Sequence, residues 1–171
     1  MIKQPASLIS HFEEALGPAG LEAVRSRVEH EAKPAPHKSH SLTTGKCAVY
    51  VFSLSKAWGS GCAAGADRVL KVGKAGLTSN ARFQSQHYNP NSARSTLAGS
   101  LLRCRVLWPY LGIANLTEAD VGEWIRKNVD RDNFYLDVSD QGLLGQLETY
   151  IRGVLGSMFE GTESRRDWDN A

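Results

Sequence analysis

Residues 47–54 constrain the fold of this chain more than any other segment. Their sequence, Cys-Ala-Val-Tyr-Val-Phe-Ser-Leu, is rich in β-branched and aromatic residues and predicts a mostly buried strand. A loop rich in Gly, Ser and Ala follows over residues 55–66, and a second apolar segment over residues 68–72 ends at Gly73-Lys74-Ala75-Gly76. The two segments therefore predict a β-hairpin with a long loop.

Helices are predicted before and after this hairpin, from apolar residues at helical spacing. Ser7–Leu16 and Leu21–Glu31 predict an N-terminal helical hairpin. Residues 33–40, with two prolines and two histidines, predict an extended linker whose histidines are solvated. After the β-hairpin, helices are predicted over about residues 79–87, 93–102, 117–129 and 142–155, and short strands over residues 103–108 and 134–138.

A single globular domain without a membrane span is expected from length and composition. The chain has 171 residues, of which 42% are hydrophobic and 22% are charged, and it contains no run of 18 apolar residues. Its N-terminal sequence lacks the layout of a signal peptide, so we expect a soluble, cytoplasmic protein with no membrane partner. The three cysteines are odd in number and not at metal-binding spacing, which argues against a disulfide framework and a structural zinc site.

Charge is segregated along the chain, although the formal net charge is only +2. Residues 46–105 hold nine Lys and Arg against one Asp, whereas residues 106–171 hold six basic and twelve acidic residues. The basic block predicts a polyanionic partner, and the alternative is that the two blocks neutralise each other across the fold. The expected contacts to a nucleic-acid backbone are Lys74, Arg94, Arg103 and Arg105.

Four short motifs, taken in order, resemble those of the GIY-YIG nuclease family. They are the hydrophobic frame around Tyr50, the segment Lys71–Gly76, the segment Asn80–His87 and the segment Gln146–Tyr150. Lys71 stands where the second motif of the family has a tyrosine, and some members of the family have lysine there.

The resemblance covers residues 46–160 and implies a fold as well as an activity. The implied fold is an α/β domain of the α+β type over residues 41–171, with a small, mainly antiparallel, three-stranded sheet flanked by helices. Residues 1–40 would form the N-terminal helical hairpin and linker.

The resemblance also implies a role for each matched side chain in phosphodiester hydrolysis. Tyr50 would lie beside the attacking water, and because a phenol is a poor base at neutral pH, Lys71 would supply a cation that favours its phenolate. Arg82 would form forked hydrogen bonds to the scissile phosphate. His87, ranked above Tyr88, would hydrogen-bond the water or protonate the leaving oxygen. The alternatives are a core tyrosine beside a surface lysine, a solvated arginine, and a structural histidine that ends the helix.

Glu148 would be the one protein ligand of a Mg²⁺ or Mn²⁺ ion, with water and phosphate oxygens completing the shell. Arg152 lies one helical turn later, so an ordinary ion pair along the helix is the alternative for Glu148. The family also has a late asparagine, for which Asn170 is the only candidate after Glu148. Residues 68–75 do not fit Gly-x4-Gly-Lys-Ser/Thr, so a nucleotide-binding P-loop is not indicated.

These features predict a metal-dependent endonuclease that cuts DNA, of a restriction or repair type. Cutting a duplex with one active site per chain favours a homodimer, and a nicking monomer is the alternative. A non-catalytic nucleic-acid-binding or protein-interaction module on the same fold is the second hypothesis, supported by the lysine at position 71. A third is an interaction protein that does not bind nucleic acid.

Overall fold

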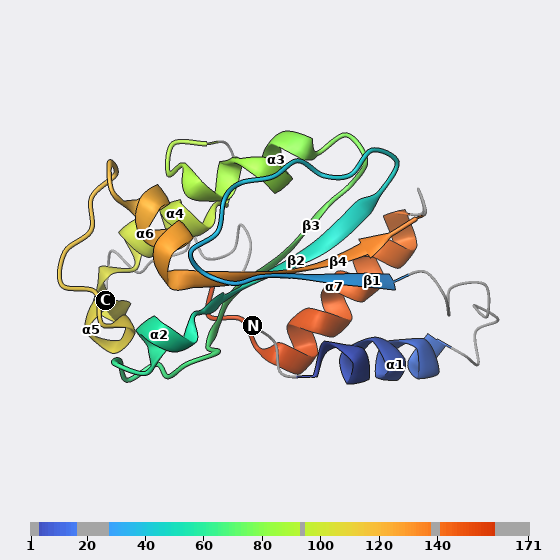
Figure 1. Ribbon diagram of the computed structural model, residues 1–171, viewed down its shortest axis with the longest axis horizontal. Coiled ribbons are helices and arrows are strands. Elements are labelled where there is room, and N and C mark those ends of the chain that lie inside the picture. The colour runs from blue at the N-terminus through green and yellow to red at the C-terminus, as the bar shows by residue number, and fades with distance from the viewer. Residues whose placement is uncertain (1–3, 17–27, 93–94, 138–140, 160–171) are drawn as a thin grey trace.

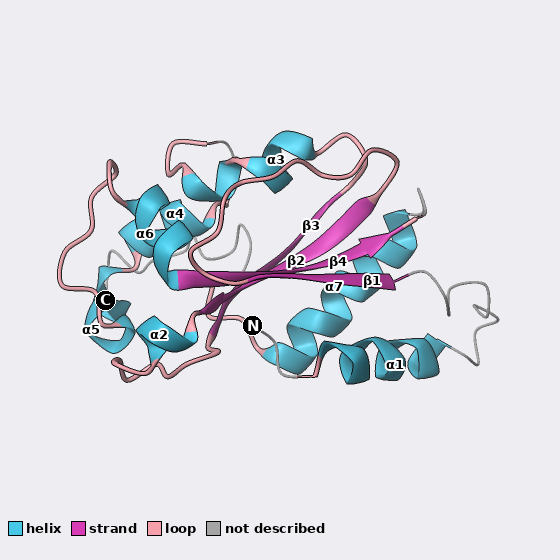
Figure 2. Cartoon of the chain, in the orientation of Figure 1, coloured by secondary structure: helices cyan, strands magenta, loops and turns pink. Residues whose placement is uncertain are grey.

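Four antiparallel strands form the middle layer of the fold, in the spatial order β1-β4-β2-β3. Their bounds are Val28–Lys33 for β1, Cys47–Leu54 for β2, Val69–Ala75 for β3 and Val129–Leu136 for β4. The computed structural model describes residues 4–16, 28–92, 95–137 and 141–159, and their elements are shown in Figures 1 and 2.

Helices cover both faces of this sheet (Figure 1). One face packs against α1, Pro5–Leu16, and α7, Gln141–Leu155. The other face packs against α3 (Asn80–Gln84), the 3-10 helix η3 (Gln86–Tyr88), α4 (Leu97–Arg103) and α6 (Val121–Asn128). Three short helices lie in the connections: α2 (Lys56–Gly59), η4 (Arg105–Leu107) and α5 (Trp108–Leu111). Within the described ranges, none of the helices combines the length and the apolar composition that crossing a membrane requires.

β2 is buried along its whole length, because it has a paired strand on each side and helices on both faces. Its alternating side chains contribute to two hydrophobic cores. Tyr50 and Phe52 belong to the core under α3, α4 and α6, whereas Val49 and Val51 belong to the core under α1 and α7.

The register of β2 against β3 brings Lys71 to the face of the sheet that holds Tyr50. Tyr50 lies opposite Gly73, and Phe52 lies opposite Lys71. Directly opposed residues of an antiparallel pair point to the same side, and so do residues two apart along one strand. Lys74 therefore points to the opposite face, where α7 lies.

The mixed α+β architecture, the central hairpin and the last helix confirm the prediction from the sequence. The predicted strand 47–54 coincides with β2, and the predicted strand 68–72 overlaps β3, its antiparallel neighbour. The first predicted helix is α1, and the helix predicted over residues 142–155 is α7. The predicted number of three strands is wrong, because β1 adds a fourth strand to the sheet.

β1 replaces the second predicted N-terminal helix over residues 28–31. It pairs with β4 over its whole length, and Glu31 accepts hydrogen bonds from Asn133 and Tyr135 on that strand. These tertiary contacts outweigh the modest helix preference of Ala, Glu and Lys. Residues 17–27 lie outside the described residues. The division at residue 40 stays a prediction, although β1 belongs to the same sheet as the later strands.

Two other expectations are wrong. Residues 103–108 form the end of α4, η4 and the start of α5 instead of a strand, because Pro109 in the first turn of α5 favours the start of a helix. The linker histidines are not both solvated, because His37 is buried and its Nε2 hydrogen-bonds the Tyr88 hydroxyl at 2.8 Å. The helix predicted over residues 93–102 begins at Leu97, and residues 93–94 lie outside the described residues.

Candidate active site

Side chains from three elements come together at the hydroxyl of Tyr50. Tyr50 comes from β2, and its oxygen accepts a hydrogen bond from Arg82 Nε of α3 at 3.0 Å. His87 of η3 places its Nε2 at 2.6 Å from the same oxygen. The ring of Tyr50 crosses β3 at Gly73, where a Cβ atom would lie 2.6 Å from the phenol oxygen. Only glycine at this position leaves room for the phenol.

The hydrogen bonds of His87 determine which of its ring nitrogens is protonated. The backbone N–H of Leu97 donates to His87 Nδ1 at 3.2 Å, so Nδ1 is an acceptor and has no proton. In the neutral ring the proton is therefore on Nε2, which donates to the oxygen of Tyr50. Burial lowers the pKa of His87 well below its ordinary value, and the charges of Arg82, Lys71 and Arg131 lower it further. His87 is thus a neutral donor at neutral pH.

Tyr50 is subject to opposing influences. Burial raises its pKa above the ordinary value, the charge and hydrogen bond of Arg82 and the charge of Arg131 lower it, and the charge of Glu148 raises it. Together these effects raise the pKa of Tyr50, so Tyr50 is a neutral phenol at neutral pH. Its oxygen nevertheless accepts two N–H hydrogen bonds, which is an arrangement that stabilises a phenolate once the proton leaves.

Lys71 is buried on the same face of the sheet as Tyr50, with only 2% of its surface exposed. Its Nζ donates a hydrogen bond to Ser95 Oγ at 2.9 Å. Burial lowers the pKa of Lys71 to about 8, and the charges of Arg82, Arg103 and Arg152 act in the same direction. The alternative of a lysine at the protein surface is therefore wrong. Lys71 is an ammonium at neutral pH and loses its proton in mildly alkaline solution.

Glu148 of α7 has two cationic partners. Its Oε1 lies 2.8 Å from Arg152 Nη2, one helical turn later, and its Oε2 lies 3.1 Å from Lys74 Nζ on β3. Its side chain is 14% exposed, so the carboxylate does not lie in bulk solvent. The ion pair within the helix, the alternative from the sequence, does form. The same carboxylate also acts on the pKa of Tyr50.

A metal ion at Glu148 would have a single carboxylate as its protein ligand. In the described part of the chain, no group of three or more His, Cys, Asp and Glu residues could hold a metal ion. Mg²⁺ in phosphoryl-transfer sites commonly keeps several waters and uses one or two carboxylates with substrate phosphates. Glu148 fits this pattern if Lys74, whose side chain is 41% exposed, leaves Oε2.

The structure separates Tyr88 from the hydroxyl of Tyr50. The oxygen of Tyr88 bonds instead to His37 Nε2 at 2.8 Å and to Arg131 Nη1 at 3.4 Å. Arg126 lies over its ring, with Cζ 4.7 Å from the centroid. Of the two candidates after Arg82, His87 is therefore the one that reaches Tyr50.

Tyr50, Lys71, Arg82 and His87 form one cluster, and the expected nucleic-acid contacts lie on two sides of it. Arg103 and Arg105 are exposed at the end of α4 and in η4, and the guanidinium of Arg105 lies over the Trp108 ring at 5.4 Å. A pocket of about 430 Å³ is lined by both arginines and Trp108. Lys74 lies on the α7 side, in its ion pair with Glu148. Arg94 and Asn170 lie outside the described residues.

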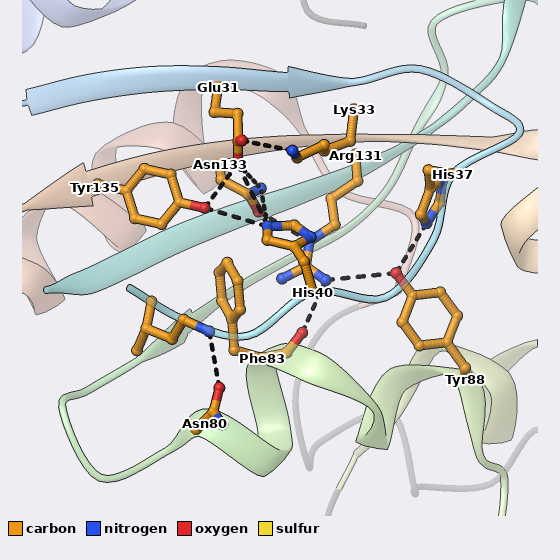
Figure 3. A network of polar contacts seen from close by, with 11 residues as sticks. Glu31, Lys33, His37, His40, Asn80, Phe83, Tyr88, Arg131, Asn133 and Tyr135 are labelled. Atoms are coloured by element: carbon orange, nitrogen blue, oxygen red, sulfur yellow. Dashed lines mark hydrogen bonds and ion pairs between the residues drawn. The ribbon is translucent and has the colours of Figure 1, made fainter. Parts of the chain in front are cut away.

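Sequence reasoning missed Arg131, the fully buried arginine in the network of Figure 3. It lies in Asp130-Arg131-Asp132-Asn133, a polar stretch typical of a loop, so the strand was predicted to begin only at residue 134. The available signal was the alternation of Arg131, Asn133 and Tyr135, which places these three residues on one face of β4.

Comparison of the chain with protein-family models, with curated proteins and with solved structures finds no match.

Proposed function

We propose that this protein is a metal-dependent endonuclease that hydrolyses phosphodiester bonds of DNA. The observation that supports the proposal is the hydrogen-bonded set of Tyr50, Arg82 and His87, with Lys71 on the same face of the sheet. These groups come from four elements between residues 47 and 88 and bring a phenol, a guanidinium and an imidazole to one point. Such a set provides a charge clamp for phosphate and groups that accept or donate a proton.

Each side chain has a defined task in the proposed reaction. Arg82 is half-buried and covers the phenol oxygen, and it also has the donors to hold a phosphate. A phosphate that binds Arg82 therefore arrives beside Tyr50. Tyr50 first releases its phenolic proton to solvent. Water then attacks phosphorus, the Tyr50 phenolate accepts the proton of that water, and the bond to the leaving oxygen breaks as that oxygen takes a proton from solvent.

Positive charge around the phosphate stabilises the transition state. Lys71 supplies a buried ammonium, and His87 donates through Nε2 to the oxygen of Tyr50, which stabilises the phenolate. Glu148 lies on the α7 side of the sheet, and its charge acts on Tyr50. It would hold the divalent ion, which would supply Lewis-acid charge for the reaction.

A cleavage assay with supercoiled plasmid tests the proposal. Nicked or linear product is expected with Mg²⁺ or Mn²⁺ and not with EDTA, and Glu148→Gln should abolish it. Glu123→Gln is the matched control, because Glu123 is an exposed helical glutamate paired with Lys127 in the same i,i+4 arrangement. Equal cleavage by Glu148→Gln and the wild type would contradict the assignment of Glu148.

A second candidate function is a DNA-binding module without cleavage. The observation that favours it is that both oxygens of Glu148 hold ion pairs, to Arg152 and to Lys74. This function predicts salt-dependent DNA binding with no product under any divalent ion. Sedimentation of the protein with and without duplex would show whether a homodimer supplies a second site for the second strand.

A further inference from the structure

The guanidinium of Arg131 lies in the middle of the fold. The residue is 0% exposed, and its Cζ lies 4.1 Å from the ring centroid of Phe83, 5.3 Å from that of Phe52 and 5.4 Å from that of Tyr50. Its Nε donates to Asn133 Oδ1 at 2.8 Å, and its Nη2 is buried without a hydrogen-bond partner among the described residues. Burial of a charge in this way costs folding free energy, so its position needs a physical explanation.

Arg131 contacts the chain next to Arg82 and next to His87, the two residues that donate hydrogen bonds to Tyr50. Its Nη1 donates to the backbone oxygen of Phe83 at 2.8 Å, and Phe83 is the residue after Arg82. The same Nη1 lies 3.4 Å from the hydroxyl of Tyr88, the residue after His87. One guanidinium on β4 therefore holds α3 and η3 in place against β2.

The nearest carboxylate in this network is two hydrogen bonds away from the guanidinium. Asn133 accepts from Arg131 and donates through Nδ2 to Glu31 Oε2 at 3.2 Å (Figure 3). Glu31 lies on the edge strand β1 with 37% of its side chain exposed, and it also accepts from Tyr135. Solvent screens this carboxylate, so it does not cancel the positive charge at the ring of Tyr50.

The charge of Arg131 distinguishes between the two protonation states of Tyr50. A cation over a neutral phenol ring is attracted by the quadrupole only, whereas a phenolate adds a full negative charge close to the cation. Arg82 and Glu148 also act on Tyr50 by charge, His87 is hydrogen-bonded to it, and Lys71 acts on His87. Of these four, only Glu148 bears negative charge, and it disfavours the phenolate.

We propose that Arg131 is a positioning residue for Tyr50, which fixes Arg82 and His87 around the phenol oxygen and stabilises the phenolate through the ring. The proposal rests on the proposed nuclease function for its catalytic meaning. The lowering of the Tyr50 pKa by the charge of Arg131 agrees with it.

The pH profile of cleavage tests this role. If Tyr50 acts as a phenolate, kcat rises with pH, and Arg131→Met should lower kcat at neutral pH by about tenfold, with KM unchanged, because the rising limb moves up by about one pH unit. Arg131→Lys should keep most of the rate. Tyr135→Phe is the matched control, because it removes a network hydroxyl from the same face of β4 without changing charge, and its profile should follow the wild type.

A second readout does not depend on cleavage. In protein labelled with fluorotyrosine, the fluorine NMR signal that Tyr50→Phe removes reports the ionisation of Tyr50. Its midpoint should move to higher pH in Arg131→Met and stay near the wild-type value in Arg131→Lys. If Arg131→Met does not fold, Arg131→Gln, which keeps an amide donor for the Phe83 carbonyl, provides the neutral variant.

The outcomes separate the two proposals. Absence of cleavage in the wild type would overturn the nuclease function, and the NMR midpoint would still decide the role of Arg131. An unchanged midpoint in the neutral variant, or equal loss of rate in Arg131→Lys and Arg131→Met, would overturn the role of Arg131 and leave the nuclease function standing.

Discussion

At the scale of single residues, burial is what makes the side chains of this site unusual. Tyr50 and His87 are neutral in the interior, and Lys71 keeps its charge there only below mildly alkaline pH. Perturbed pKa values cluster at functional sites, and of these three groups Lys71 is the one whose pKa moves toward the neutral range. A hydrogen bond from Arg82 fixes the hydroxyl of Tyr50. A hydrogen bond to Ser95 fixes the ammonium of Lys71.

Lys71 predicts a pH dependence of stability. The unfolded chain keeps the proton of Lys71 up to its ordinary pKa of 10.5, whereas the folded chain loses it near the lowered pKa of about 8. The unfolded state thus binds more protons between these values, so the free energy of unfolding increases with pH over that window. Lys71→Met should remove this increase and raise the free energy of unfolding at pH 7 by roughly 2–3 kcal/mol.

Urea unfolding at pH 7 and pH 10 measures the effect of Lys71→Met, with the exposed Lys56→Met as control. An increase with pH that is equally steep in Lys71→Met and the wild type would show that Lys71 is not its source.

The close contact between Gly73 and Tyr50 predicts that a larger side chain at position 73 is not tolerated. A methyl group at this position would meet the ring and oxygen of Tyr50 at 2.6–2.8 Å, so Gly73→Ala should destabilise the fold by about 1–3 kcal/mol and displace the hydroxyl. Gly153→Ala, in α7 with no atom within 4 Å of its Cβ position, should instead stabilise by up to about 1 kcal/mol. Thermal unfolding of both variants provides the comparison, and equal effects would contradict the close approach of Tyr50 to β3.

At the scale of elements, local patterns in the sequence predicted the parts of the fold in which one residue type dominates. β2 is a run of β-branched and aromatic residues, and α7 has apolar residues at helical spacing, so both were predicted. β1 and the first half of β4 were missed because their residues are mostly polar, and pairing between distant segments decides their structure. The same holds for the site: its matched residues were named from motifs, whereas the burial of Arg131 depends on the pairing and packing of β4, which the alternation of its residues does not reveal.

The packing of α1 predicts how far the N-terminal element supports the sheet. Phe12 is 2% exposed and lies against Tyr150 of α7, with ring centroids 5.4 Å apart. Phe12→Ala should therefore lower the free energy of unfolding by about 3 kcal/mol, whereas Glu14→Ala, exposed on the same helix, should change it by less than about 0.5 kcal/mol. Urea unfolding measures both, and a Phe12→Ala variant as stable as the wild type would contradict the docking of α1.

At the scale of the whole molecule, the basic block of the sequence extends over the site and beyond it. Lys71 and Arg82 lie inside the cluster, whereas Arg103 and Arg105 are exposed at its side. The charge of Arg103 acts on the pKa of Lys71, so this exposed arginine lies near the buried lysine. Under the proposed function, a phosphate backbone bound at Arg103 would lie on the Lys71 side of the site.

The exposed arginines predict the salt dependence of DNA binding. The logarithm of the association constant should fall linearly with the logarithm of salt concentration, and Arg103→Ala or Arg105→Ala should each reduce the slope by about one. Lys127→Ala should leave the slope unchanged, because Lys127 is paired with Glu123 in the acidic part of the chain. Fluorescence anisotropy with a labelled duplex measures the slopes, and binding that is insensitive to salt would exclude a phosphate contact at these arginines.

The rate of single-turnover DNA cleavage by Tyr50→Phe decides whether the hydroxyl of Tyr50 takes part in the proposed reaction. Phenylalanine fills the same volume between β2 and β3 but has no oxygen for the hydrogen bonds of Arg82 and His87. We predict a rate at least about 100-fold below the wild-type rate, with DNA affinity unchanged. Cleavage by Tyr50→Phe at the wild-type rate would contradict the assignment of this cluster as the active site.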